Sequence, residues 1–247
     1  MAYSYPLGIQ SWCFREFKSI PALIDALKKV GLPYVEMCPC HIDYTRDRSW
    51  TDEAFAQLKD AGIGVTAYGG VGLKNDEKDA RMLCEFARRN GIRDLTVVTV
   101  EAAAIPMLQR LAREYGVRYC VHNHGRGFQF CSFKDLKDFL AGTDASFGVC
   151  NDTAWFLDAK EDPVVAVAAF PDRTYGVHLK DFRFDAEGKP EDVIIGTGGL
   201  DLPGLFGALR KILFSGYLTL EYEGNPSDPL AEVIECLKAA RAAMAAI

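Results

Sequence analysis

The chain has 247 residues, of which 49% are hydrophobic and 25% charged, and its formal net charge is −6. This composition is typical of a globular protein with a large core, and no run of about 18 apolar residues predicts a membrane span. The acidic balance argues against nucleic acid as a partner, because binding to a phosphate backbone requires many lysines and arginines. The opening MAYSYPLGIQ lacks the basic and apolar segments of a secretory signal, so we expect a cytoplasmic protein.

Short runs typical of strands alternate with helical patterns along the whole chain. The first half contains LGIQSWCF before apolar residues at helical spacing over 20–30, YVEMCP before 52–61, GVTAYGG before 76–90, and DLTVVTV before 103–115. The second half contains YCVHNH before 133–141, FGVCND before 163–170, YGVHLKD before 202–215, and YLTLEYE before 229–246. The sequence therefore predicts eight units, each a strand followed by a helix.

Cap and turn residues mark the expected helix ends. Side chains suited to the N-cap stand at Ser19, Ser132, Asp162, Asp201 and Asp228, with Pro163 and Pro229 expected at first helical positions. Left-handed glycines are expected at the helix ends at Gly31, Gly62, Gly91, Gly116, Gly142 and Gly216.

Eight such units, with strands too apolar to face water, predict one (β/α)8 TIM barrel over residues 1–247, in which parallel strands lie inside a ring of helices. An open doubly wound sheet is the alternative, but no glycine-rich phosphate fingerprint follows the first strand. The exposed helix faces show no clear partner patch, which leaves a homo-oligomer open.

The eight cysteines are scattered through apolar segments, without the spacing of a metal site or a disulfide framework. We expect most of them to be reduced core residues. Cys38 and Cys40, in the stretch CPC, are the exception, because residues two apart could share one face of a strand. Packing is the favoured interpretation of this pair too.

Polar residues gather at the C-terminal ends of the predicted strands, where a barrel of this kind has its active site. They are Glu36, His122, His124, Asp152, His178, Lys180, Glu221 and Glu223. Residues two apart in a strand share a face. We therefore expect the same direction for the two side chains of each pair: His122 with His124, His178 with Lys180, and Glu221 with Glu223. Buried imidazoles and carboxylates cost several kcal/mol unless they are paired or bind a cation. We therefore expect one divalent metal ion, for which manganese, cobalt, zinc, iron and magnesium all suit nitrogen and oxygen ligands.

Each of these residues has an ordinary alternative when taken alone. A single barrel histidine is commonly a hydrogen-bonded core residue, Asp152 could cap the loop after its strand, and Glu221 could pair with Lys180. Their coincidence on consecutive strands favours the metal site.

Three motifs resemble those of the xylose isomerase-like TIM barrel superfamily: HLKD at 178–181, NDTAW at 151–155 and LEYEGN at 220–225. The resemblance covers essentially the whole chain, and LGIQSWCF, YVEMCPCH and VHNHG are similar to strands of its sugar phosphate isomerase/epimerase branch. In that family one divalent metal is held by a glutamate, an aspartate, a histidine and a glutamate on strands five to eight. The resemblance implies Asp152, His178 and Glu221 as ligands, and His122 stands in place of the first glutamate.

The family's epimerases exchange a proton between two glutamates, and this chain keeps only Glu221 for that role. The resemblance implies a metal-dependent isomerase or epimerase that acts on a sugar, keto-sugar or related polyol through an enediolate. A lyase of the inosose dehydratase type, acting on a keto-sugar or cyclitol, is the alternative. Glu221 or His124 would be the base, and Lys180 would stabilise oxyanion charge or protonate the leaving oxygen. A degenerate barrel that only binds sugars is the non-enzymatic alternative, and an abasic-site endonuclease is disfavoured by the negative charge.

Further residues are candidates for binding a sugar-type substrate. Trp155 stands where the epimerases have a histidine, and both it and Trp12 could stack on a sugar or merely pack at the rim. Glu36 and His41 are expected to meet substrate hydroxyls, although His41 could instead cap a loop. The cluster GTGG at 196–199 predicts turns rather than a phosphate site, because no arginine or lysine adjoins it. An unphosphorylated substrate is therefore expected.

Overall fold

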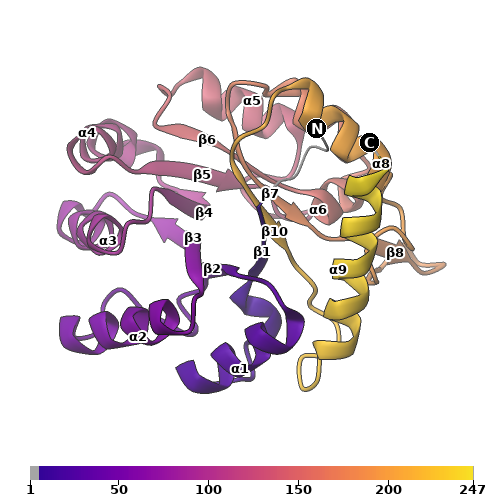
Figure 1. Cartoon of the computed structure of the whole chain (residues 1–247). Coiled ribbons are helices and arrows are strands. Elements are labelled where there is room, and N and C mark those ends of the chain that lie inside the picture. Colours follow the sequence, from indigo (N-terminus) through magenta and orange to yellow (C-terminus); the bar gives the residue numbers. More distant parts are fainter. Residues whose placement is uncertain (1–5, 247) are drawn as a thin grey trace.

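A computed structural model describes residues 6–246 of the chain. Eight parallel strands close into a barrel in the order β1-β10-β7-β6-β5-β4-β3-β2, and helices surround it (Figure 1). The barrel strands are β1 (Leu7–Gln10), β2 (Tyr34–Met37), β3 (Gly64–Leu73), β4 (Asp94–Val100), β5 (Arg118–His122), β6 (Phe147–Asp152), β7 (Thr174–Leu179) and β10 (Tyr217–Leu220). The predicted (β/α)8 barrel is confirmed.

The helices follow the strands along the chain, as the sequence predicted. They are α1 (Ile20–Val30), α2 (Arg48–Asp60), α3 (Glu77–Arg89), α4 (Ile105–Tyr115), α5 (Phe133–Ala141), α6 (Thr153–Asp158), α7 (Pro163–Ala169), α8 (Leu202–Lys211) and α9 (Leu230–Ala245). The structure adds elements that the sequence pattern did not predict: α6, the 3-10 helices η1 (Ser11–Phe14) and η2 (Ala102–Ala104), and an antiparallel hairpin of β8 (Phe182–Phe184) with β9 (Pro190–Asp192). None of the helices within residues 6–246 has the length and hydropathy needed to cross a membrane.

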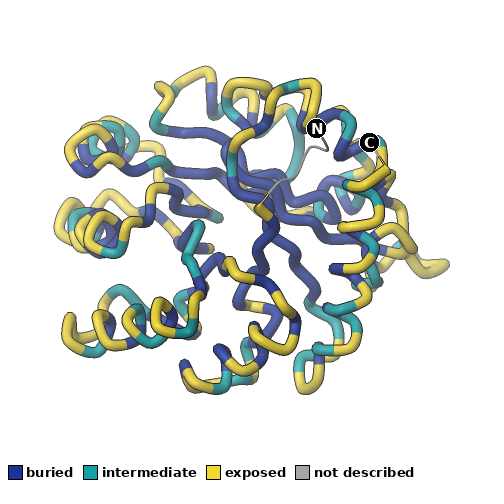
Figure 2. Tube along the Cα trace, in the orientation of Figure 1, coloured by how far each residue is buried: buried dark blue, intermediate teal, exposed yellow. Residues whose placement is uncertain are grey.

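The strands are apolar because both of their faces are covered. Figure 2 shows the barrel strands largely buried, with intermediate and exposed residues chiefly on β3, whereas the helices bury one side and expose the other. Every residue of β6, β7 and β10 is buried. Polar side chains inside this barrel therefore have no bulk water to solvate them, and each needs a partner in the protein or a ligand.

Most predicted helix caps are present. Ser19, Ser132, Asp162 and Asp201 each accept a hydrogen bond from a backbone N–H of the first helical turn. The prediction for the last helix was wrong, because Pro229 itself occupies the cap position and no side chain caps that helix.

Four of the six predicted helix-ending glycines are left-handed. Gly31, Gly62, Gly91 and Gly116 have φ between 70° and 75°. Gly142 has a φ of −93°, and Gly216 is absent from the positive-φ residues of the described chain. The helix expected over 202–215 ends at Lys211, because the chain turns at Leu213, which itself takes the left-handed conformation with a φ of 52°.

Candidate metal centre

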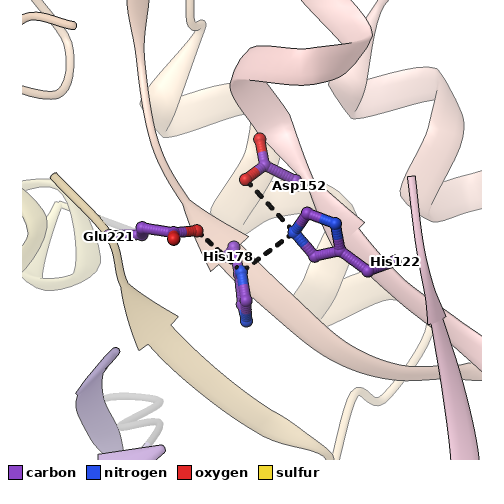
Figure 3. A group of neighbouring side chains, drawn as sticks. All are labelled: His122, Asp152, His178 and Glu221. Atoms are coloured by element: carbon purple, nitrogen blue, oxygen red, sulfur yellow. Dashed lines mark hydrogen bonds and ion pairs between the residues drawn. The ribbon is translucent and has the colours of Figure 1, made fainter. Parts of the chain in front are cut away.

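Four side chains from neighbouring strands converge at the C-terminal end of the barrel (Figure 3). His122 and Asp152 end β5 and β6, His178 lies on β7, and Glu221 directly follows β10. One ligand atom from each lies within 4.8 Å of those of the others, and all four residues are buried. This is the set of metal ligands that the sequence predicted, now brought together in space.

The contacts between these atoms require a positive charge. His178 Nδ1 lies 2.9 Å from Glu221 Oε2 and 3.2 Å from His122 Nε2, and His122 Nε2 lies 3.5 Å from Asp152 Oδ2. A neutral imidazole has one nitrogen that only accepts, so these nitrogens and oxygens cannot all be matched as donors and acceptors without an added proton or cation. A divalent ion with nitrogen and oxygen ligands fits this set.

Glu36 fixes the ring of His178 from behind. Its Oε2 lies 2.7 Å from His178 Nε2, and its Oε1 accepts a 2.5 Å hydrogen bond from Thr96 Oγ1. A carboxylate only accepts, so Nε2 carries the ring proton and Nδ1 turns its lone pair toward the other ligands. Glu36 is fully buried and does not line the cavity described below, so its predicted contact with substrate hydroxyls is corrected: it positions a ligand.

Asp152 has one oxygen in use and one free. Its Oδ1 accepts from Trp155 N at 3.0 Å, capping α6, so the capping role considered from the sequence applies to this oxygen. Its Oδ2 is buried with no hydrogen-bond partner, as is Nδ1 of His122. Asn123 locks the Asp152 backbone, because its side chain both donates to Asp152 O at 2.9 Å and accepts from Asp152 N at 2.8 Å. A buried carboxylate oxygen that is held in place without a partner fits a cation site.

The charge states of the ligands agree with this interpretation. Burial disfavours a charged His178, but the Cys150 side chain and the Glu36 and Glu221 carboxylates outweigh it, and the pKa of His178 is raised well above its ordinary value. Burial likewise opposes ionisation of Glu221, but the Lys180 ammonium and His178 lower its pKa on balance. The site thus holds Glu221 ionised and attracts positive charge, which a metal ion would supply.

A cavity of about 260 Å³ opens above these ligands. Its lining residues are Gln10, Trp12, Cys38, Gly69, Gly70, Thr96, Val98, His122, His124, Trp155, His178, Glu221 and Glu223. The volume lies near the lower end of small-molecule sites, about 300–1,000 Å³, and suits a compact substrate. Trp12, Trp155 and His124 line it as expected, while Gln10 and the two glycines of β3 were missed.

One wall of the cavity is an aromatic stack. The His124 ring lies between Phe128 and Trp155, with centroid distances of 4.0 and 4.3 Å. Gly125 permits this packing, since a Cβ there would lie 2.6 Å from the Trp155 ring. Burial, and then repulsion from His122, lowers the pKa of His124 to about 4. His124 Nδ1 accepts from Gly125 N at 3.0 Å, so the neutral ring carries its proton on Nε2 and presents a donor to its surroundings.

Lys180 and Glu223 form an ion pair beside this wall, with the Lys180 ammonium 5.2 Å from the centre of the Trp155 ring. The Lys180 ammonium contacts Glu223 Oε1, and Glu223 Oε2 accepts from Trp12 Nε1 at 2.9 Å. Burial disfavours the charge of Lys180, but the carboxylates of Glu221, Asp152 and Glu223 raise its pKa on balance. Lys180 is 1% exposed and lies behind the cavity lining, so its charge acts on the cavity through Glu223.

Two further predictions concern loops. His41 does not line the cavity: its Nε2 lies 3.1 Å from Phe14 O and its Nδ1 3.2 Å from Cys40 Sγ, so the predicted substrate contact is replaced by a contact between loops. In the cluster GTGG, the N–H groups of Gly196 and Gly198 donate to Asp181 Oδ2 at 2.8 and 2.9 Å. These amides are already used, which agrees with the prediction of turns rather than a phosphate site.

Comparison with known proteins assigns the family. Residues 24–240 match the sequence model of the xylose isomerase-like TIM barrel family. The chain belongs to this family. The resemblance stated from the HLKD, NDTAW and LEYEGN motifs is thereby confirmed.

Individual members of the xylose isomerase-like family are more distant. An inosose dehydratase of Klebsiella pneumoniae is 29% identical over 138 residues, which make up 49% of this chain and 46% of that protein. An inosose dehydratase of Clostridium tetani is 26% identical over 155 residues, 56% of this chain and 51% of that protein. The chain thus spans about half the length of these relatives. The crystal structure of the IOLI protein, which holds a zinc atom, aligns with a TM-score of 0.78 at 16% identity and covers 98% of both chains. At this identity the likeness shows the fold.

Proposed function

We propose that the protein is a divalent-metal-dependent lyase that removes water from a keto-sugar or keto-cyclitol. The observation that carries the proposal is the single ionised carboxylate, Glu221, that faces the cavity among the four converging ligands. His122 occupies the position of the family's other glutamate, so exchange of a proton between two carboxylates is not supported. The match to proteins named inosose dehydratase favours elimination among the reactions that need one base.

The residues proposed to hold the ion are His122, Asp152, His178 and Glu221. When bound, a divalent ion would polarise the substrate carbonyl and stabilise the enediolate that forms from it. Glu221 would take the proton from the carbon next to the carbonyl. Glu36 and Asn123 keep His178 and Asp152 in place and need not touch the substrate.

The cavity walls would orient the sugar. Trp12 and Trp155 line the cavity and would contact the apolar side of the sugar ring, with one face of Trp155 already packed on His124. His124 is proposed as a hydrogen-bond donor and not as the base, because its free nitrogen carries the proton. Lys180 would stabilise oxyanion charge, and its ammonium would supply, through the Glu223 carboxylate that it contacts, the proton with which the leaving hydroxyl departs as water.

Isomerisation with Glu221 as the one base is the second candidate. It uses the same site. Its support is the likeness in fold to sugar epimerases: the structure of the 3-keto-D-glucoside 4-epimerase of E. coli aligns with a TM-score of 0.74 at 17% identity. The products separate the two reactions. Dehydration lowers the substrate mass by one water and forms an absorbing enone or diketone, whereas isomerisation conserves mass.

Elemental analysis of the reconstituted protein tests the metal site first. We expect near one equivalent of divalent metal in the parent and a clear loss in Asp152→Asn, which retains an oxygen to cap α6 but not the carboxylate charge. Asp162→Asn, at the cap of α7, is the matched control and should bind metal like the parent. The loaded parent is then incubated with an inosose and followed by mass spectrometry. Absence of metal in the reconstituted parent would refute the proposal, and a sugar product of unchanged mass would replace the lyase by the isomerase.

A further inference from the structure

The segment that follows β2 forms a tight turn containing two cysteines. His41 N donates to Cys38 O at 3.0 Å, and Cys40 N donates to Cys38 Sγ at 3.4 Å. The turn therefore folds Cys40 back over the sulfur of Cys38. Cys38 is buried and lines the cavity, whereas Cys40 is exposed to solvent. The pair thus joins the protein surface to the wall of the cavity.

His41 is placed to activate Cys40. Its Nδ1 lies 3.2 Å from Cys40 Sγ, and its Nε2 lies 3.1 Å from the Phe14 carbonyl oxygen. Because a carbonyl only accepts, Nε2 carries a proton and Nδ1 is the atom that receives the thiol proton. A nucleophile, a base and a group that orients the base are the parts of an activated thiol site. The hydrogen bond from Cys38, and then His41, lowers the pKa of Cys40 to about 5.

Cys38 has the complementary character. Its hydrogen bond to Cys40 and its burial raise its pKa, so it stays a thiol when Cys40 is a thiolate. One sulfur is thus reactive and reachable, and the other is protonated, sheltered and adjacent. Redox-sensing cysteines commonly have this arrangement of an attacking thiolate beside a resolving thiol.

We propose that Cys38 and Cys40 are a hydroperoxide-reactive dithiol at the edge of the cavity. The Cys40 thiolate attacks one oxygen of a hydroperoxide, the O–O bond breaks, and the product is a Cys40 sulfenic acid together with the alcohol or water formed from the other oxygen after it takes a proton. The Cys38 thiol then attacks the Cys40 sulfur, which forms the disulfide and releases the sulfenic oxygen as water. The peroxide is reduced by two electrons, and the two thiols supply them.

Oxidation would act on the cavity because of what the turn touches. Cys38 lines the cavity, and its backbone N–H donates to Ser11 Oγ at 2.7 Å, while His41 contacts Phe14. Both contacts hold η1, the short helix that carries Trp12. A disulfide moves one wall residue and the turn that anchors another. We therefore expect oxidation to reduce turnover, an expectation that rests on the proposed function.

Cys131 is the natural comparison within the chain. It is the other cysteine of the described residues that is not fully buried, and burial followed by repulsion from Asp135 raises its pKa. Reaction at a thiolate should vary little between about pH 6 and pH 8, whereas reaction at an ordinary thiol should rise about tenfold per pH unit. The pH profiles of the two cysteines should therefore differ.

The test treats the full-length protein with hydrogen peroxide and digests it with trypsin. Cleavage after Lys29 and Arg46 releases both cysteines in one peptide, and we expect this peptide to become lighter by two hydrogen atoms and resistant to alkylation. In Cys38→Ser the Cys40 sulfenic acid should be trapped by a 1,3-dione, and in His41→Gln the flat pH profile of Cys40 alkylation should be lost. Cys131→Ser should behave like the parent.

Activity gives a second measurement with the substrate found above. Peroxide should lower the rate of the parent, a dithiol reductant should restore it, and Cys40→Ser should resist the inactivation. The mass and alkylation data do not depend on turnover, so they distinguish failure of the dithiol from failure of the proposed reaction. The proposal is overturned if the 30–46 peptide keeps two alkylatable thiols under peroxide, or if Cys40→Ser is inactivated as fast as the parent.

Discussion

Replacing Glu36 by glutamine tests whether the protein positions its metal ligand from behind. Glu36 lies outside the cavity and accepts a hydrogen bond from His178 Nε2 at 2.7 Å. Glutamine keeps the shape and can still accept through its amide oxygen, but it removes the negative charge. The variant should therefore bind a metal more weakly although none of the four ligands has changed.

The expected size follows from the contacts that are lost. Outer partners of metal-bound histidines typically contribute about 10–100-fold in affinity, or roughly 1.4–2.7 kcal/mol. The metal affinity of Glu36→Gln should fall about tenfold, because the amide oxygen still accepts from His178. The Thr96 hydroxyl, which lies 2.7 Å from Tyr217 OH, can turn to that partner. The loss of metal affinity in Glu36→Ala should approach about a hundredfold, because His178 Nε2 then loses the Glu36 carboxylate as its acceptor.

Competition with a chromogenic chelator for Zn²⁺ measures these affinities. Asp94→Asn is the matched control, because Asp94 is also a buried carboxylate but begins β4 at the other end of the barrel, where it pairs with Arg118 at 2.6 Å. It should lower stability and leave zinc affinity unchanged. The reasoning is refuted if Glu36→Ala binds zinc as tightly as the parent, or if Asp94→Asn weakens binding as much as Glu36→Gln does.

Three further changes probe the site. The folded-state pKa of His124, about 4, lies below its unfolded value near 6.5. The unfolded chain therefore binds more protons than the folded chain as the pH falls. Because solvent screens the partly exposed ring, the chelator-treated parent should lose about 1 kcal/mol more than His124→Gln between pH 7 and pH 5 in urea unfolding. Asn123→Ala should lower the free energy of unfolding by about 1–3 kcal/mol, because the buried backbone N–H and C=O of Asp152 lose their hydrogen bonds to the Asn123 side chain. An unchanged urea midpoint would contradict this. Trp155→Leu should raise the KM for the sugar about fivefold, near 1 kcal/mol, with metal content unchanged, and a parallel loss of metal would instead indicate a structural role.

The sequence was sufficient to predict which four side chains converge at the end of the barrel, because a simple rule places them. Parallel strands of a barrel end on one face, and His122, Asp152, His178 and Glu221 each stand at or beside such an end. Their spacing along the chain is irregular, so only their position at the strand ends marks them as a group. The period of two along a strand then separated inward from outward residues.

The depth of a residue inside the barrel was not predictable in the same way. Glu36 shares the strand-end position of the ligands, but its carboxylate is buried between His178 Nε2 and the Thr96 hydroxyl and does not reach the cavity lining. Registers between strands depend on packing across the whole barrel. Asn123 was not predicted for a related reason. It stands between His122 and His124 in the sequence, on the other face of the strand pattern, and its side chain holds the backbone of Asp152 at the end of the neighbouring strand β6.

We expect His122 to stand in place of a glutamate of the family, and this exchange bears on which ion the site prefers. With two carboxylates, Asp152 and Glu221, and two imidazoles, a divalent ion would leave the four ligands and the ion together neutral, whereas a third carboxylate would leave one negative charge. Nitrogen ligands suit zinc, cobalt and iron, while magnesium prefers oxygen and keeps its waters. We therefore expect Zn²⁺ or Co²⁺ to displace a chelator-buffered Mg²⁺, and His122→Glu to shift the preference back toward Mg²⁺ and Mn²⁺. Equal competition by magnesium in the parent would show that His122 is not among the ligands.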